Sequence, residues 1–65
     1  MTTFTAPKGK FRVIGVDTFD GTDWVEKDLD TKQEALDWAR SRGGTMLKMH
    51  VYDDTGRHIG QAGSF

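Results

Sequence analysis

The stretch DTKQEALDWARSRGG, residues 30–44, decides the fold because it predicts one helix in the middle of a chain of strands. Thr31 can cap the first free N–H groups of the helix, and Glu34 follows it at the spacing of a capping box. One stripe at helical spacing consists of Ala35, Leu36, Trp38, Ala39 and Arg42. Gly43-Gly44 is expected to end the helix with a residue in the left-handed conformation. A helix of about eleven residues is therefore predicted.

A β-hairpin is predicted before this helix. KFRVIGVD (residues 10–17) is rich in β-branched and aromatic residues, and WVEKDL (residues 24–29) is the expected return strand. Asp20-Gly21 lies between them and is a strong hairpin signal, because a type I′ turn needs positive φ at both central residues.

A two-residue turn would fix the register of this hairpin. It would place Val16 opposite Val25, Ile14 opposite Lys27, and Asp17 opposite Trp24. One face would then carry Ile14, Val16, Val25 and Leu29, and the other Phe11, Val13 and Trp24. A change of one residue in the loop length would reassign these faces.

A second hairpin is predicted after the helix. TMLKMHVY (residues 45–52) alternates, with Leu47, Met49 and Val51 on one side and Met46, Lys48, His50 and Tyr52 on the other. DDTG (residues 53–56) fits a type I turn with a glycine bulge, followed by a strand over residues 57–61. This register places Val51 opposite Ile59 and Tyr52 opposite His58.

The predicted fold class is α+β, with the element order β-β-α-β-β. One helix between the hairpins favours a four-stranded antiparallel sheet of order 2-1-3-4, with the helix packed on one face. Residues 10–61 form the single domain, residues 1–9 a flexible N-terminal arm and residues 62–65 a C-terminal tail.

Composition narrows the classes of function. The 65 residues carry a net charge of −1 and include no cysteine, so disulfides and cysteine-bound zinc are excluded. A core this small is expected to gain stability from packed aromatic residues or from self-association as a homodimer. The balanced charge offers no basic face for a nucleic-acid duplex. No apolar run is long enough to span a membrane and no secretion signal is seen, so a cytoplasmic protein is expected.

Two groups of side chains contain residue types that can bind a metal or transfer protons. His50, Tyr52 and His58 share one face of the second hairpin and resemble the parts of an acid–base or metal site. A zinc site takes three or four protein ligands, however, and the predicted register places no carboxylate beside these three residues. Three aspartates at every third position, Asp17, Asp20 and Asp23, do not match the alternating ligands of a calcium loop and favour a solvated turn. No enzymatic activity, metal or cofactor is predicted.

A protein partner or a second copy is the expected partner, and Trp24 is central to the predicted surface. With Gly15 beside it on the neighbouring strand, the Trp24 indole has room to lie on the sheet face opposite the helix. The binding surface would then consist of Phe11, Val13, Trp24, His50 and Tyr52. The alternative is that Trp24 faces the helix and packs on Trp38 as part of the core.

Binding of single-stranded nucleic acid is the main alternative function. Aromatic residues flanked by basic ones on a sheet can stack bases. Here these residues would be Phe11 and Tyr52 among Lys8, Lys10, Arg12, Lys48 and Arg57. The acidic loops disfavour this interpretation.

Three motifs carry a resemblance to known proteins. Trp24-Val25-Glu26, residues 30–35 (DTKQEA) and residues 54–57 (DTGR) follow one another in the chain. In this respect residues 10–65 resemble an uncharacterised family of small bacterial proteins, which implies the same two-hairpin fold and no functional residues. The hairpin followed by DTKQEAL also resembles HicB-type antitoxin domains, which implies an antitoxin-like regulatory role. The proline-containing segment that those domains have between hairpin and helix is absent here.

Overall fold

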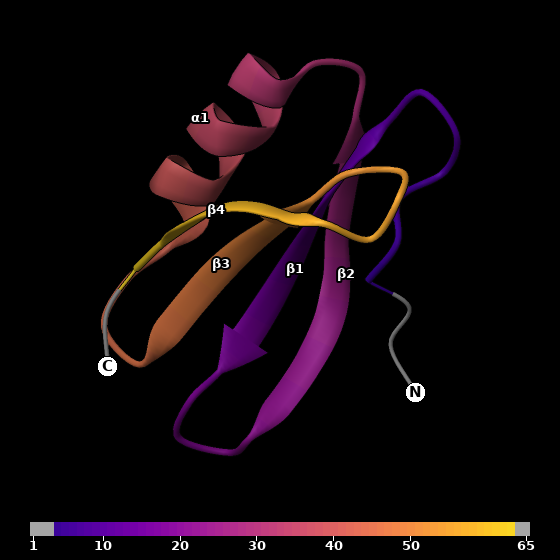
Figure 1. The fold of residues 1–65 in the computed structure, drawn as a ribbon. Helices are drawn as coiled ribbons and strands as arrows, with labels where there is room; N and C mark the ends of the chain where they lie inside the picture. The colour runs from indigo at the N-terminus through magenta and orange to yellow at the C-terminus, as the bar shows by residue number, and fades with distance from the viewer. Residues whose placement is uncertain (1–3, 64–65) are drawn as a thin grey trace.

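The fold is a four-stranded antiparallel sheet with one helix across one face, as seen in a computed structural model that describes residues 4–63 (Figure 1). The elements are β1 (Phe11–Asp17), β2 (Thr22–Leu29), α1 (Lys32–Arg42), β3 (Leu47–Tyr52) and β4 (His58–Ala62). The strand order is β2-β1-β3-β4, and each neighbouring pair is antiparallel. The predicted α+β class and sheet order are confirmed.

The helix begins where the capping residues predict. The Thr31 hydroxyl accepts a hydrogen bond from the Glu34 backbone N–H at 3.1 Å and donates one to the Glu34 carboxylate at 2.9 Å. At the other end, the Gly43 N–H donates to the Ala39 carbonyl at 2.8 Å. The φ of Gly43 is −69° and Gly44 has no positive φ either, so the predicted left-handed glycine is wrong. Gly43 is needed for a different reason. A Cβ there would lie 2.9 Å from the backbone nitrogen of Gly63, because the helix end meets the backbone beyond β4.

The core lies between α1 and the sheet. Its buried residues are Val13, Met49 and Val51 from the strands and Ala35 and Ala39 from the helix. The two alanines let the helix axis approach the sheet closely, as their small side chains predict. Around them pack larger, partly buried side chains, among them Phe11, Trp24, Leu29, Leu36 and Trp38.

Three of the five residues predicted to form a partner surface lie on the helix-covered face, whereas His50 and Tyr52 lie on the opposite face as predicted. Val13 belongs to the core, and Phe11 and Trp24 pack against it. The prediction that these three residues lie on the face opposite the helix is therefore wrong. The alternative position for Trp24, against the core, is the one observed.

The register of the first hairpin explains part of this result. Asp17 pairs with Thr22, so the loop is residues 18–21 rather than the two residues predicted, and Ile14 rather than Val16 faces Val25. A bulge opposite the Val13–Ile14 step shifts the rest of β2 by one residue. Leu29 therefore lies opposite Phe11 and turns to the helix side.

Trp24 lies directly opposite Gly15, and the space predicted for its indole is present. A Cβ built on Gly15 would lie 2.5 Å from Cε2 of Trp24. Only a residue without a side chain allows the indole to lie flat across β1 at this position.

The second hairpin turns as predicted but with a different register beyond its first pair. The Gly56 N–H donates to the Asp53 carbonyl at 3.2 Å and Gly56 has a φ of +84°, as a type I turn with a glycine bulge requires. Tyr52 faces His58, which confirms that pair. The next pair is Val51 with Gly60, so the predicted pairing of Val51 with Ile59 is wrong.

The N-terminal segment lies against this second hairpin. The Ala6 N–H donates to the Asp53 carbonyl at 3.0 Å, and Ala6 is buried. The ring of Phe4 stacks on Tyr52 with centroids 5.0 Å apart. Residues 4–9, predicted as an arm, thus contact the domain, and Ala62, predicted as tail, is the last residue of β4. Residues 1–3 and 64–65 of the predicted arm and tail lie outside the described residues.

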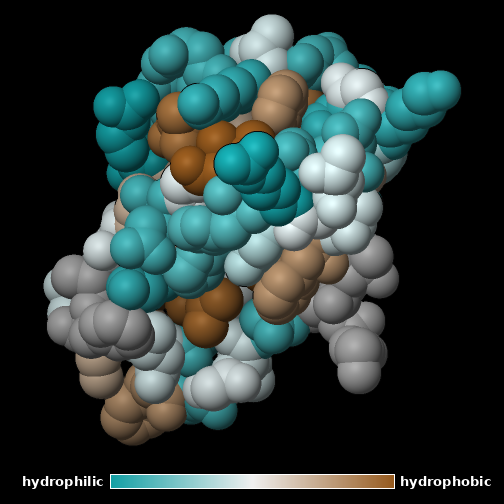
Figure 2. All heavy atoms as spheres, viewed as in Figure 1, coloured by the Kyte–Doolittle hydropathy of each residue, from teal (hydrophilic) through white to brown (hydrophobic). Residues whose placement is uncertain are grey.

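The two outer strands differ in charge. β2 carries a bulge and four charged residues, Asp23, Glu26, Lys27 and Asp28, whereas β4 (HIGQA) has no acidic residue, lysine, arginine or proline. In the view of Figure 2 the described hydrophobic residues form separate areas with hydrophilic ones between them. Within residues 4–63, α1 is the one helix, and it is too short and too polar to cross a bilayer.

Candidate functional site: the open face of the sheet

The sheet face opposite α1, called the open face below, carries three rows of cross-strand neighbours. The first row is Asp28, Arg12, Tyr52 and His58; the second is Val25, Ile14, His50 and Gln61; the third is Asp23, Val16 and Lys48. The middle row therefore holds no Asp, Glu, Lys or Arg and has two apolar residues, Val25 and Ile14, at its β2–β1 half, whereas the two outer rows hold the acidic residues, lysine and arginine of this face.

Ile14 is the centre of the middle row. It is fully buried although no helix covers this side, because the side chains around it close over it. Val25, its neighbour on β2, is 42% exposed, and His50, its neighbour on β3, is half-buried. The accessible apolar surface of the open face thus lies beside Ile14 at Val25, and over Tyr52 at Phe4, which is 37% exposed.

An aromatic cluster lies at the β3–β4 side of the open face. Tyr52 stacks on Phe4, and its ring centroid is 5.3 Å from that of His58 at an angle of 66°. Nδ1 of His50 and Nε2 of His58 are 3.2 Å apart. The predicted gathering of His50, Tyr52 and His58 is confirmed. Phe4 was not predicted, because no pattern in the first nine residues indicates that they fold back.

The environment of His50 favours its neutral form. Its burial, and then the positive charges of His58 and Lys48, lower the pKa of His50 below the ordinary 6.5. At neutral pH the His50 ring is therefore uncharged and keeps one nitrogen lone pair available as an acceptor or ligand.

Basic residues predicted to bind nucleic acid form ion pairs with acidic residues of the chain itself, which the sequence did not indicate. Arg12 donates from Nε to Asp28 at 2.7 Å and from a terminal nitrogen to the other Asp28 oxygen at 3.0 Å. This two-point ion pair raises the pKa of Arg12. Lys10 likewise bonds Asp30. Because Phe11 faces the helix, the series of basic and aromatic residues proposed to stack bases is not assembled on one face.

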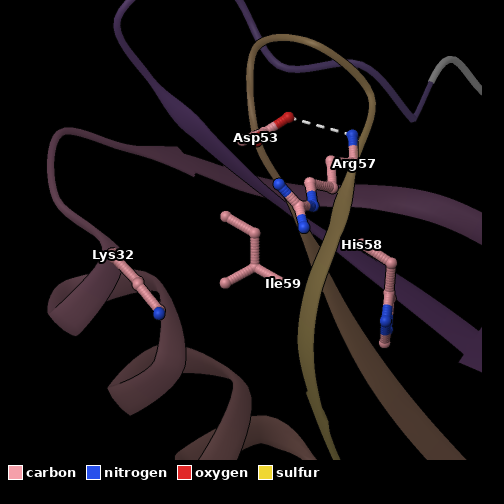
Figure 3. Close-up of a pocket in the computed structure, with 5 residues that line it drawn as sticks. All are labelled: Lys32, Asp53, Arg57, His58 and Ile59. Carbon is pink, nitrogen blue, oxygen red and sulfur yellow. Dashed lines mark hydrogen bonds between the residues drawn. The ribbon is translucent and has the colours of Figure 1, made fainter.

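A hollow of about 320 Å³ lies on the α1 side of the sheet, between the start of α1 and the second hairpin. In Figure 3, Lys32 and Arg57 point toward the space around Ile59, whereas the His58 ring points to the other side of β4. The Asp53 carboxylate accepts from the Thr55 hydroxyl (2.7 Å) and from the N–H groups of Thr55 and Arg57 (both 2.9 Å). These bonds, chiefly that of the hydroxyl, lower the pKa of Asp53. The Asp53 carboxylate therefore stabilises the turn of the second hairpin.

The aspartates of the first hairpin behave as turn residues. Asp17 accepts hydrogen bonds from the N–H groups of Phe19 at 2.9 Å and Asp20 at 3.2 Å. Within residues 4–63, no three or more His, Asp or Glu side chains gather in a metal-binding arrangement. The interpretation of this loop as a turn whose aspartate bonds its own backbone is confirmed for Asp17.

Comparison of the chain with protein-family models, with curated proteins and with solved structures gave no match. The resemblances carried by the helix start and the two hairpins therefore stay predictions.

Proposed function

We propose that this chain is a small, non-enzymatic interaction module that pairs with a second copy through the open face. The observation that supports this proposal is the arrangement of that face: a middle row without Asp, Glu, Lys or Arg, with exposed Val25 beside buried Ile14, lies between two rows that hold those charged residues. Protein interfaces commonly have an apolar centre and a polar rim. The Phe4–Tyr52 pair adds aromatic area at one side of the same face.

The distribution of charge favours a second copy as the partner. On the open face, β2 contributes Asp23 and Asp28, of which Asp28 is paired with Arg12 of β1, whereas β3 contributes Lys48 and β4 contributes no acidic residue. A twofold axis parallel to the strands would bring the β2 side of one copy over the β3–β4 side of the other. The row of Asp23 and Lys48 in one copy would then face the same row of the other in the reverse order, so that acidic and basic ends lie over each other, and the two middle rows would meet near the axis.

The size of the molecule limits the affinity that we expect between the two copies. Its Cα extents are 31 × 25 × 15 Å, so the broadest face covers about 780 Å² (31 × 25 Å). A standard interface buries roughly 800 Å² on each partner. The pairing would use almost the whole open face, so we expect a reversible dimer that dissociates on dilution.

Sedimentation equilibrium over a concentration series centred on tens of micromolar tests the proposal. Val25→Lys places a charge in the middle row at an exposed position and is expected to shift the chain toward monomer without unfolding it. Phe19→Lys is the matched control, because Phe19 is 78% exposed in the loop of the first hairpin, away from the three rows. A wild-type chain that is monomeric throughout, or equal effects of the two substitutions, would contradict the proposal.

Binding of single-stranded nucleic acid remains a second candidate, supported by the stacked Phe4–Tyr52 pair on a sheet face. Asp23 and Asp28 on the same face oppose it. Fluorescence titration with short single strands at low salt tests this candidate where its electrostatic contribution is greatest. Binding that Tyr52→Ala weakens by about 1–3 kcal/mol would support it, and an absence of binding at low salt would remove it.

A further inference from the structure

β4 forms an edge of the sheet beside α1. It is the last strand in the sheet order, and within residues 4–63 it pairs on one side only, with β3. In Figure 1 no other labelled element passes in front of it. A bulge at Ile59 interrupts its first part, so residues 60–62 are the regular part of this edge. An edge strand presents backbone N–H and C=O groups to which an extended segment of another protein can add as a further strand.

Two hollows follow one another along β4 on its α1 side. The first is the hollow of about 320 Å³ at the start of α1 and of β4. The second, of about 240 Å³, is lined by Leu36, Arg40, Gly60 and Gln61. Leu36 reaches the strand, because a Cβ built on Gly60 would lie 2.7 Å from its Cδ2. Successive turns of α1 therefore lie beside successive residues of β4, and the space between them is called the α1–β4 groove below.

The helix side of the α1–β4 groove has cations at both ends and an apolar residue between them. Lys32, Leu36 and Arg40 line it and are four residues apart, so they share one face of α1. Arg57 lines the same hollow as Lys32, and both side chains point toward the space around Ile59 (Figure 3).

These cations are available to an acidic partner. Within residues 4–63, neither Lys32 nor Arg57 takes part in an ion pair, and Arg40 has only an exposed pair with Asp37, at 3.0 Å. Asp53 also lines the first hollow, but one of its oxygens accepts three hydrogen bonds from its own turn. The lining of the first hollow is therefore net positive.

We propose that the α1–β4 groove binds an extended segment of a partner protein, which pairs with residues 60–62 as a further strand and carries the pattern acidic–x–apolar–x–acidic. Four residues of helix advance about 6 Å and two residues of strand about 6.8 Å. Alternate side chains of the segment would therefore meet Lys32, Leu36 and Arg40 in turn. The pattern reads the same in both directions, so it holds for a parallel or an antiparallel segment.

This site goes beyond the proposed pairing and does not depend on it, because the groove lies on the α1 side of the sheet and the pairing uses the open face. The β4 strand of a second copy complements the groove less well than an acidic segment does. Its sequence, HIGQA, offers no carboxylate to Lys32 and Arg57.

The test is a titration of the untagged chain with the capped peptide Thr-Asp-Thr-Val-Thr-Asp-Thr, followed by backbone ¹H–¹⁵N correlation spectra and amide hydrogen exchange. We expect saturable binding, shifts at β4 and Leu36 rather than at Val25 on the open face, and slower exchange within residues 60–62. A second peptide has Pro-Pro in place of the central Thr-Val, which removes a backbone donor from both edges of the peptide. It is expected to bind at least about tenfold more weakly.

Lys32→Glu reverses one charge of the groove, and the helix tolerates it because an acidic residue in the first turn is favourable. It is expected to weaken binding of the first peptide at least about fivefold. Lys8→Glu is the matched control, because Lys8 is exposed and lines neither hollow, and it should leave the affinity within about twofold of wild type. Circular dichroism establishes that each variant is folded.

An absence of saturable binding up to about 1 mM peptide, or equal effects of the two substitutions, would overturn the proposal. Equal binding of the Pro-Pro peptide would also overturn it, because attraction between charges alone would then explain the affinity. Shifts centred on Val25 would instead place the peptide on the open face. Concentration-dependent shifts along β4 without peptide would assign the groove to a second copy. A chain that is monomeric in sedimentation but binds the peptide would contradict the pairing and support this site.

Discussion

At the scale of single residues, Gly15 shows how one missing side chain sets the position of Trp24. A Cβ at residue 15 would lie 2.5 Å from Cε2 of the indole, well inside van der Waals contact. Gly15→Ala is therefore expected to lower the free energy of unfolding by about 1–3 kcal/mol through overpacking. Gly44→Ala is the matched control, because a Cβ there meets nothing within 4 Å, and a change within about 0.5 kcal/mol is expected. Urea denaturation measures both, and equal effects would contradict the prediction.

Glu26 gives a prediction about pH. Its carboxylate accepts from the Trp24 indole N–H at 2.7 Å and from Nε of Arg42 at 2.8 Å. The indole bond first, and then Arg42, hold the pKa of Glu26 below its ordinary 4.5, although burial opposes them. The ionised form therefore stabilises the folded state above pH 4.5, and this contribution is lost as the pH falls through the lowered pKa.

Glu26→Gln should remove that dependence. We expect the stability difference between wild type and Glu26→Gln to shrink as the pH falls from about 7 through the lowered pKa of Glu26, because the protonated glutamate is then neutral like glutamine. Chemical denaturation over a series of falling pH values measures the difference. A gap that does not change with pH would mean that the charge of Glu26 contributes nothing.

The wrong prediction that Phe11, Val13 and Trp24 lie opposite the helix is also explained by single residues. β1 is apolar on both sides, with Phe11 and Val13 on one and Ile14 and Val16 on the other. The alternation of β1 alone therefore gives no reason for the helix to cover either side. The aromatic neighbours His50, Tyr52 and His58 were predictable because they depend only on the Tyr52–His58 pair next to the tight turn.

At the scale of elements, the start of α1 is the part best predicted from the sequence, because a cap depends on residues three apart. The Thr31 hydroxyl is bonded to both the backbone and the side chain of Glu34. Thr31→Ala is expected to lower stability by about 1 kcal/mol, whereas Thr31→Ser, which keeps the hydroxyl, should stay near wild type. Thermal denaturation by circular dichroism compares the two. A serine variant as unstable as the alanine variant would show that the methyl group, not the hydroxyl, contributes.

Bulges explain why the strands were predicted in place but not fully in register. Each hairpin contains one irregular step, at Val13–Ile14 and at Val51–Tyr52, and beyond it every pair is shifted. A hydrophobic pattern with a period of two fixes which residues share a face only while the strand is regular. The four-residue loop of the first hairpin added a further shift, because Asp17 bonds the loop backbone and closes the turn early.

At the scale of the whole molecule, residues 4–9 join the start of the chain to the turn of the last hairpin. Ala6 bonds Asp53, Gly9 bonds Asp54 at 2.9 Å, and Phe4 stacks on Tyr52. Two hydrogen bonds and one aromatic pair suggest that deleting residues 1–9 costs about 2 kcal/mol. Urea denaturation of the shortened chain measures this cost. An unchanged midpoint and slope would show that these contacts do not contribute to stability.

The unequal outer strands decide how far any strand-to-strand association could extend. A β4 without acidic residues, lysine, arginine or proline can meet the β4 of another copy, whereas the charged and bulged β2 resists a further addition. Growth in this direction would therefore stop at two chains, since both remaining ends of the joined sheet would be β2 strands. The charges of β2 thus limit strand-to-strand assembly to two chains. If these charges were neutralised, further chains could add at β2 and a pair could grow into a fibre.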